Sequence, residues 1–206
     1  QANIYQQFQE GKRYAAGTDT SHGAGQDFAV TVVLDSVTGY IVADICSQVI
    51  NPTELAVASV DLLNRYDAPI WAIEDNDWGI LTIAMAQDLR YRRLHYRDSD
   101  HPGWHTYDTA GMSGGSRYIL WGDLIEAVHS RSITVPNPEG LSQFFTVIRN
   151  PEKRGRIEAQ YGTHDDYPMA VGMAWQMRQY ARPSGSERGR RANPHRRRRR
   201  GWARWS

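Results

Sequence analysis

Three strand-like segments follow one another near the N-terminus, and together they restrict the chain to a fold built around a sheet. Residues 14–19 are short, small and β-compatible, and the segment ends on Asp19. Residues 28–34 form a nearly unbroken apolar run, typical of a strand buried on both faces, and residues 40–46 follow after a turn. We predict three adjacent strands, with a carboxylate at the end of the first in a rigid position suited to holding a metal ion. The alternative is that Asp19 only begins a polar turn, where aspartate is common.

The rest of the chain alternates between helical and extended patterns. Asn51-Pro52 and Asn137-Pro138 each combine a side-chain cap with proline at the first helical position. We expect the second of these helices to bury Leu141, Phe144, Phe145 and Ile148. The other expected elements are strands at 70–74, 93–96, 133–135 and 157–160, helices at 80–89 and 118–128, and a last helix that Asp165 and Asp166 open and that carries Met169, Met173 and Met177. Strands first and then a β-α alternation predict an α/β fold, a mixed central sheet flanked by helices on both faces.

Composition sets the remaining limits. The chain has 206 residues, 40% of them hydrophobic, which is enough for one full-sized core. No apolar run approaches the roughly 20 residues of a membrane-spanning helix, and no signal peptide is recognisable, so we expect no membrane association. The lone Cys46 excludes an internal disulfide and is expected to be a small core residue. Residues 182–206 hold ten of the 24 Lys and Arg residues but one of the 23 Asp and Glu residues, so an acidic body carries a basic tail.

Acidic residues stand at three informative positions. Asp19 and Glu74 each end a predicted strand, and Asp165-Asp166 opens the last helix. Each has a simpler explanation, because a strand can merely reach water there, and acids in a first helical turn favour the helix dipole. Thr163 and Asp166 also have the spacing of a capping box. One acid suffices for capping, however, and if the three positions converge they form an all-oxygen site suited to Mg²⁺ or Mn²⁺, in which two ions can promote phosphodiester hydrolysis.

Several motifs in order resemble the C-terminal nuclease domain of the large terminase subunit of tailed bacteriophages or prophages. The resemblance covers about residues 12–181, and it is specific as an ordered set although each motif alone is weak. The motifs are Gly17-Thr18-Asp19, Ile73-Glu74-Asp75-Asn76, Gly103-Trp104-His105-Thr106, Arg117 before a helix, Leu141-Ser142-Gln143-Phe144-Phe145 and His164-Asp165-Asp166.

The resemblance implies a ribonuclease H-like fold and metal-dependent endonuclease cleavage of concatemeric double-stranded viral DNA during genome packaging in the host cytoplasm. It implies that Asp19 and Glu74 are catalytic metal ligands, completed by one or both of Asp165 and Asp166, with Mg²⁺ or Mn²⁺ as cofactor and two ions in all. Expected partners are DNA, the portal protein, the small terminase subunit and an N-terminal ATPase domain. That motor is not expected in this chain, since its only Gly-Lys pair, Gly11-Lys12, lacks the rest of a Walker A loop.

Other candidates are secondary. His22 can contact metal or substrate, or be solvated, and His164 can orient the acids or only flank the helix. The expected phosphate contacts, each with a solvated surface side chain as the alternative, are Arg117, Lys153, Arg154 and Arg156. We expect residues 1–11 to be a linker or the start of an excised domain, 12–181 the nuclease domain, and 182–206 a disordered basic tail that binds polyanions.

Two other functions compete with this interpretation. The first is a junction resolvase or transposase-type nuclease on the same fold, which would prefer four-way junctions to linear duplex. The second is a non-catalytic packaging module that binds DNA or the portal and cleaves nothing at any Mn²⁺ concentration.

Overall fold

A mixed five-stranded sheet forms the centre of the computed structural model, which describes residues 1–25, 27–107, 115–153 and 155–185. The strand order is β1-β4-β3-β2-β5, and all neighbours are antiparallel except the parallel pair β2 and β5. The strands are β1 (Asn3–Ile4), β2 (Tyr14–Asp19), β3 (Ala29–Asp35), β4 (Ile41–Ser47) and β5 (Ile70–Ile73). The predicted meander and the helix-connected fourth strand are thus confirmed.

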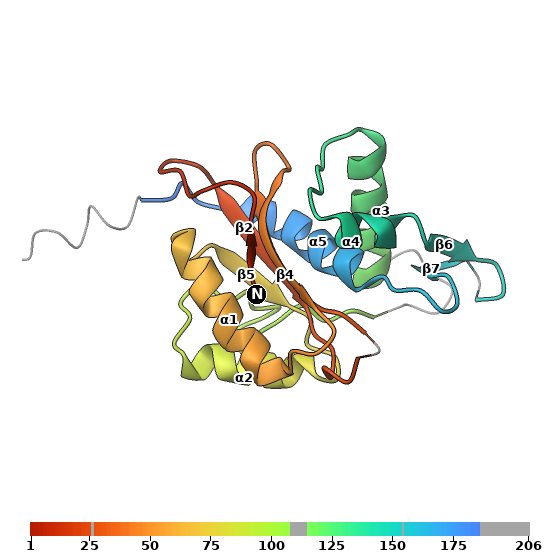
Figure 1. Ribbon diagram of the computed structural model, residues 1–206, viewed down its shortest axis with the longest axis horizontal. Coiled ribbons are helices and arrows are strands. Elements are labelled where there is room, and N and C mark those ends of the chain that lie inside the picture. The colour runs from red at the N-terminus through yellow and green to blue at the C-terminus, as the bar shows by residue number, and fades with distance from the viewer. Residues whose placement is uncertain (26, 108–114, 154, 186–206) are drawn as a thin grey trace, which may run out of the picture.

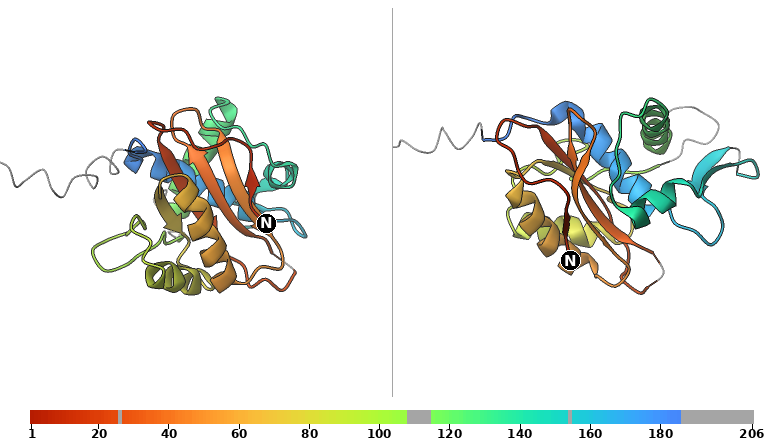
Figure 2. Two further views of the ribbon diagram at one scale, coloured as in Figure 1. Left: turned by 60° about the vertical axis from the view of Figure 1, so that its left-hand side comes forward. Right: turned by 45° about the horizontal axis from the view of Figure 1, so that its top comes forward.

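Helices cover both faces of this sheet, as predicted (Figure 1). One face packs on α1 (Pro52–Arg65) and α2 (Gly79–Asp88), and the other on α5 (Asp166–Met177) with α3 (Ser116–His129) and α4 (Pro138–Phe144) beside it. Figure 2 shows the two layers from two further directions. The alternation of strand side chains explains both cores, since Ala16 and Val33 face α1 whereas Ala15 and Val32 face α5.

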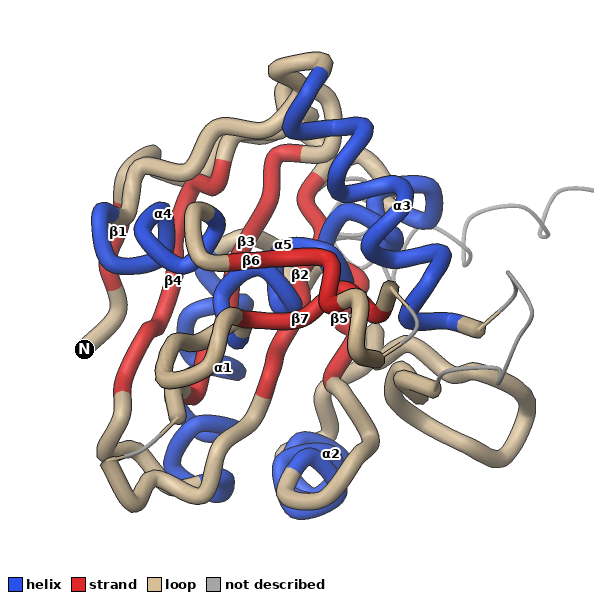
Figure 3. The backbone as a smooth tube through the Cα atoms, turned by 90° about the vertical axis from the view of Figure 1, so that its right-hand side faces the viewer, coloured by secondary structure: helices blue, strands red, loops and turns tan. Residues whose placement is uncertain are grey.

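The predicted helix after Asn137 is shorter than expected. It ends at Phe144, and residues 147–150 instead form strand β6 (Val147–Asn150), which pairs with β7 (Arg156–Ala159) outside the central sheet (Figure 3). The prediction that this helix buries Leu141, Phe145 and Ile148 is therefore wrong: these side chains are 41%, 81% and 40% exposed. The β-branched run Thr146-Val147-Ile148 favours the strand over a continued helix.

Four other segments differ from expectation. Residues 1–11 contribute strand β1 to the sheet edge, and residues 182–185 are held by a bridge between Arg13 and Pro183. The segments at 93–96 and 133–135 form only isolated bridges, to Trp71 and Tyr40. The remainder of the basic tail, residues 186–206, lies outside the described residues. In the part of the chain that is described, no helix has the length and apolar character needed to cross a bilayer.

Helix α5 lies directly on strand β2 because the strand carries glycine at the contact. A Cβ atom added to Gly17 would stand 2.1 Å from the carbonyl oxygen of Ala170 and 2.6 Å from the amide nitrogen of Ala174. Both are backbone atoms, so no rotamer change can make room for a side chain. Gly17 therefore sets the distance between Asp19, two residues later on β2, and the helix that begins at Asp166.

A buried carboxylate in strand β4 also holds the start of α5 against the sheet. Asp44, fully buried in β4, accepts hydrogen bonds from Tyr167 (2.7 Å), Asn137 (2.9 Å), Asn3 (2.8 Å) and Tyr5 (3.0 Å). Four donors compensate the loss of water around this carboxylate, which a buried charge requires. Because Tyr167 follows Asp166 in the chain, the network also fixes the first turn of α5.

Candidate metal centre

The parallel pairing of β2 and β5 places two of the predicted acids side by side. Thr18 pairs with Ile73, so Asp19 and Glu74 leave the sheet at the same edge. The Glu74 amide also donates to the Thr18 carbonyl oxygen at 3.0 Å, which extends the pairing by one step. In open α/β sheets, ligand-binding sites lie at the carboxyl ends of the strands, and Asp19 and Glu74 stand at such an end.

Local contacts then fix Glu74. Its carboxylate accepts a hydrogen bond from the Asn76 side chain (3.1 Å), which also donates to the Thr106 carbonyl oxygen (3.1 Å). The adjacent Asp75 turns elsewhere and binds His105 (2.7 Å) and Arg97 (3.3 Å). Glu74 and Asp75 are adjacent in the chain, but their side chains are held by different partners.

The two acids at the start of α5 have different partners. Asp165 forms an ion pair with Arg117 (3.1 Å), whose guanidinium also donates to the Ile157 carbonyl oxygen (3.1 Å). Asp166 accepts a hydrogen bond from the Phe28 amide (2.8 Å). The alternative of a capping box is not realised, since Asp165, the N-cap residue, makes no capping hydrogen bond and the Thr163 hydroxyl donates to the Gln160 carbonyl oxygen.

The electrostatics of the site connect Asp19 with Glu74 and Asp166. Asp19 is 9% exposed, and its pKa lies well above the usual range because burial removes water and the carboxylates of Glu74 and Asp166 repel its charge. Burial also raises the pKa of Asp166 to about 6, with Asp165 and Asp27 adding to the shift and the Phe28 amide opposing it. The negative charge crowded around Asp19 and Asp166 makes a site that a bound cation would relieve.

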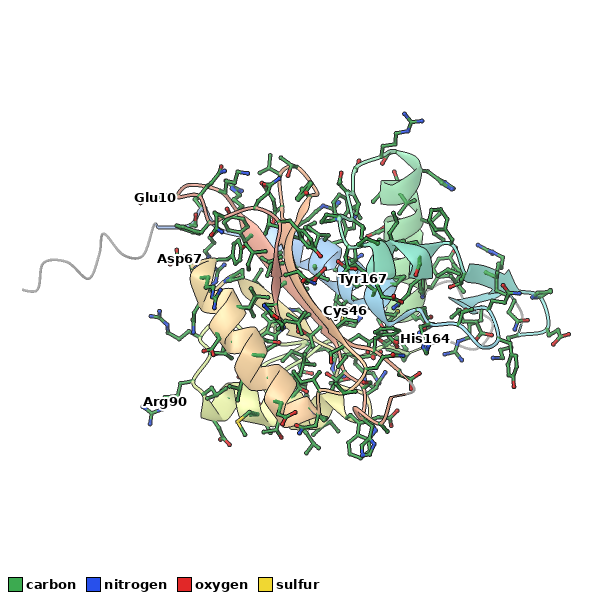
Figure 4. All side chains as sticks on the ribbon, viewed as in Figure 1. Glu10, Cys46, Asp67, Arg90, His164 and Tyr167 are labelled. Carbon is green, nitrogen blue, oxygen red and sulfur yellow. The ribbon has the colours of Figure 1, made fainter. Side chains whose placement is uncertain are left out.

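Asp166 also belongs to a second group of possible metal ligands. Asp27, His164 and Asp166 each offer a ligand atom, and these three atoms lie within 4.8 Å of one another; Asp19 and Glu74 are not part of this group. His164 lies beside the loop that precedes β3 (Figure 4). The sequence interpretation missed Asp27, although an antiparallel hairpin necessarily brings the residue before β3 to the edge where β2 ends.

The other sequence candidates lie in two places. The exposed His22 packs against Trp78, with ring centroids 4.3 Å apart. Arg117, Lys153 and Arg156 line one cleft of about 820 Å³ between β6–β7 and the start of α5. Arg117 is engaged by Asp165, and Glu158 pairs with both Lys153 (2.7 Å) and Arg156 (3.6 Å), so acids neutralise much of this surface. Arg154 lies outside the described residues.

Comparison with known proteins gives a consistent fold. No family model matches the sequence, and no curated protein is similar to it. Among solved structures, the large terminase nuclease of thermophilic phage G20c with bound cobalt aligns with this chain at 15% identity and a TM-score of 0.69. The alignment covers 85% of this chain and 86% of the phage nuclease. The same nuclease with bound magnesium gives 16% identity and 0.65, over the same shares of the two chains.

The nuclease domain of the Thermus phage P74-26 large terminase extends the similarity to a second phage. It aligns over 84% of each chain at 19% identity, with a TM-score of 0.63. At such identities the similarity concerns the fold, and it confirms the ribonuclease H-like architecture implied by the ordered motifs. The chain therefore has the fold of the nuclease domains of phage large terminases.

Proposed function

We propose that this chain is a metal-dependent endonuclease that cleaves double-stranded DNA. The convergence of Asp19, Glu74 and Asp166 at one edge of the sheet carries the proposal. The similar G20c nuclease has been solved with cobalt, magnesium and zinc, which supports a divalent cation as cofactor. The raised pKa of Asp19 adds support, since perturbed carboxyl groups gather at functional sites.

The donor atoms suit Mg²⁺ or Mn²⁺. Asp19, Glu74 and Asp166 supply oxygen ligands, which hard cations prefer, and His164 adds one nitrogen that Mn²⁺ also accepts. Asp166 belongs to both donor groups, so it would contribute to holding an ion with Asp19 and Glu74 and a second ion with Asp27 and His164. Bound cations in such a site supply Lewis-acid stabilisation for the attacking and leaving oxygens of a phosphodiester.

Residues around the ligands serve as positioning groups. Arg117 holds Asp165 through its ion pair, which leaves Asp166 as the acid of the pair directed toward the site. Asn76 holds one Glu74 oxygen at 3.1 Å and leaves the other for a cation. Such outer contacts fix the direction of ligand lone pairs and commonly change metal affinity 10- to 100-fold.

The biological setting belongs to the same proposal. We infer cleavage of concatemeric viral DNA at the start and end of packaging, in the host cytoplasm. A motor domain preceding this one, the portal protein and the small terminase subunit are the partners that such a role implies. Translocation is assigned to that motor, and hydrolysis by this chain requires no ATP.

Asp19→Asn tests the proposal directly. The substitution keeps the size of the side chain but removes the charge that a cation requires, so Mn²⁺-dependent nicking of supercoiled plasmid is expected to fall by more than about 100-fold. Asp77→Asn is the matched control, because Asp77 is exposed and has a φ of 44°, a conformation that asparagine tolerates. Gel electrophoresis of plasmid and circular dichroism of both variants give the measurement.

Two results would contradict the proposal. Unchanged nicking by Asp19→Asn would remove this carboxylate from the reaction. No nicking by the original chain at any Mn²⁺ concentration, despite DNA binding, would instead favour a non-catalytic packaging module.

Gly79→Ala is expected to reduce cleavage without touching a ligand. The added Cβ would stand 1.7 Å from the Glu74 carbonyl oxygen, so the backbone that carries this acid must shift. Displacement of a reacting group by about 1 Å can lower the rate about 100-fold. We expect weaker Mn²⁺ binding by calorimetry and slower nicking in parallel, and an unchanged Mn²⁺ affinity would show that Glu74 does not depend on this contact.

A further inference from the structure

A basic cleft lies along the β5 edge of the sheet, away from the acids. It has a volume of about 660 Å³, and Arg92, Arg93, Arg97 and Arg182 line it together with His95, Tyr96 and Tyr180. None of the residues that line it is an aspartate or glutamate. This distinguishes it from the cleft at β6–β7, where acids pair with the basic residues.

Two of its guanidinium groups have no partner among the residues that the structure describes. Arg97 is held by Asp75 (3.3 Å) and Asp98 (3.7 Å), and Arg93 donates to the Ala68 carbonyl oxygen (3.5 Å). Within the described ranges, Arg92 and Arg182 form no ion pair or side-chain hydrogen bond, and both are exposed. Two unpaired arginines across one cleft form a site for an anion with several oxygens.

Aromatic rings accompany the positive charge. Tyr180 stacks on His95, with centroids 6.2 Å apart and planes 28° from parallel, and is itself 52% exposed. Tyr96 is 45% exposed. Exposed tyrosines add to such a surface, because their hydroxyl groups can donate to the phosphate oxygens of duplex DNA, as arginine side chains do.

The cleft leads toward the candidate metal centre. Residues 92–97 run parallel to β5: Leu94 bridges Trp71, and the Trp71 amide donates to the Arg93 carbonyl oxygen at 2.9 Å. At the far end of this segment, Arg97 contacts Asp75, the neighbour of Glu74. The four steps from Ile70 to Glu74 span about 13 Å, which corresponds to about four nucleotides of duplex.

We propose that this cleft binds the phosphate backbone of DNA about four nucleotides from the bond that is cut, with Arg92 and Arg182 as the principal contacts. The distance to the cut bond rests on the proposed nuclease function, whereas binding of DNA to the cleft requires no cleavage. An acidic protein segment offers carboxylates to the same arginines, but the course of residues 92–97 beside β5, the strand that Glu74 follows, favours DNA.

The test compares Arg92→Gln/Arg182→Gln with Arg65→Gln/Arg131→Gln in the full chain. Arg65 and Arg131 are exposed and lie outside the cleft lining. Binding of a fluorescent duplex is measured by anisotropy in EDTA over a series of salt concentrations. Each phosphate contact contributes about 0.9 to the slope of log K against log salt, so the cleft variant is expected to lose about 2 from that slope and the control variant nothing.

Arginine footprinting locates the contact independently of the basic tail. Duplex DNA in EDTA is expected to protect Arg92 and Arg182 from phenylglyoxal and to leave Arg65 and Arg131 reactive, as read by mass spectrometry. Unchanged slope or unprotected cleft arginines would overturn the inference, and equal protection by polyglutamate would overturn the assignment to DNA. If plasmid nicking fails but protection occurs, the proposed nuclease function falls while the cleft stands.

Discussion

Asp166→Asn is expected to make the metal-free protein more stable at pH 8 while removing metal-dependent cleavage. The folded protein raises the pKa of Asp166 from 3.8 to about 6. Each pKa unit corresponds to about 1.4 kcal/mol, so ionising this acid in the folded state costs about 3 kcal/mol. The asparagine avoids that cost, and its side-chain oxygen can still accept the Phe28 hydrogen bond.

The upward shift in the pKa of Asp166 gives a pH dependence of stability that can be measured. Because the folded state binds the proton more tightly than the unfolded state, the free energy of unfolding of the unchanged protein in EDTA falls as pH rises from about 4 through about 6. The variant lacks this contribution, so the two curves converge below about pH 4 and separate above it. Urea unfolding at a series of pH values gives both curves.

Added Mn²⁺ should reverse the order. A ligand that binds only the folded state stabilises it according to its concentration and affinity, and the variant has lost the shared ligand. Asp77→Asn serves again as the control and should follow the unchanged protein throughout. A variant less stable than the unchanged protein in EDTA at pH 8 would show that the Asp166 charge is not a cost to the fold.

Strand β3 and helix α4 show how far residue patterns predict this fold. The apolar run at 28–34 has one reasonable interpretation, a strand buried on both faces, and the structure has it. After Asn137 the apolar residues recur at helical spacing, yet the helix ends at Phe144 because β6 pairs with β7, nine residues later. Helical periodicity within residues 141–148 does not report that pairing, since it depends on a strand that follows this segment in the chain.

The candidate site divides in the same way. The ends of two predicted strands point to Asp19 and Glu74, and the parallel pairing of β2 and β5 brings these residues to one edge of the sheet. The difference between Asp165 and Asp166 depends on Arg117, 48 residues earlier, and the contribution of Asp27 depends on the path of a loop. Adjacent acids are identical in pattern, so only the tertiary contacts separate them.

Gly17→Ala is expected to destabilise the fold and weaken the metal centre together, although it leaves every charged group in place. The new Cβ would lie 2.1 Å from the Ala170 carbonyl oxygen and 3.0 Å from the Met173 Cβ, so β2 and α5 must separate. Overpacking of this kind costs about 1–3 kcal/mol and sometimes more, and the contact between two backbones favours the upper end. Separation also moves Asp166 away from Asp19, so Mn²⁺ affinity and plasmid nicking should both fall.

Gly122→Ala provides the matched comparison, the same change at a glycine with open space around it. Gly122 lies inside helix α3, and a Cβ there meets nothing within 4 Å. Alanine is favoured over glycine in a helix by up to about 1 kcal/mol, so this variant should be slightly more stable than the unchanged protein and equally active. Thermal unfolding and Mn²⁺ titration of both variants separate the two sites. If Gly17→Ala binds Mn²⁺ as tightly as Gly122→Ala, the distance between β2 and α5 does not set the geometry of the metal centre. Asp19 and Asp166 would then bind metal independently of each other.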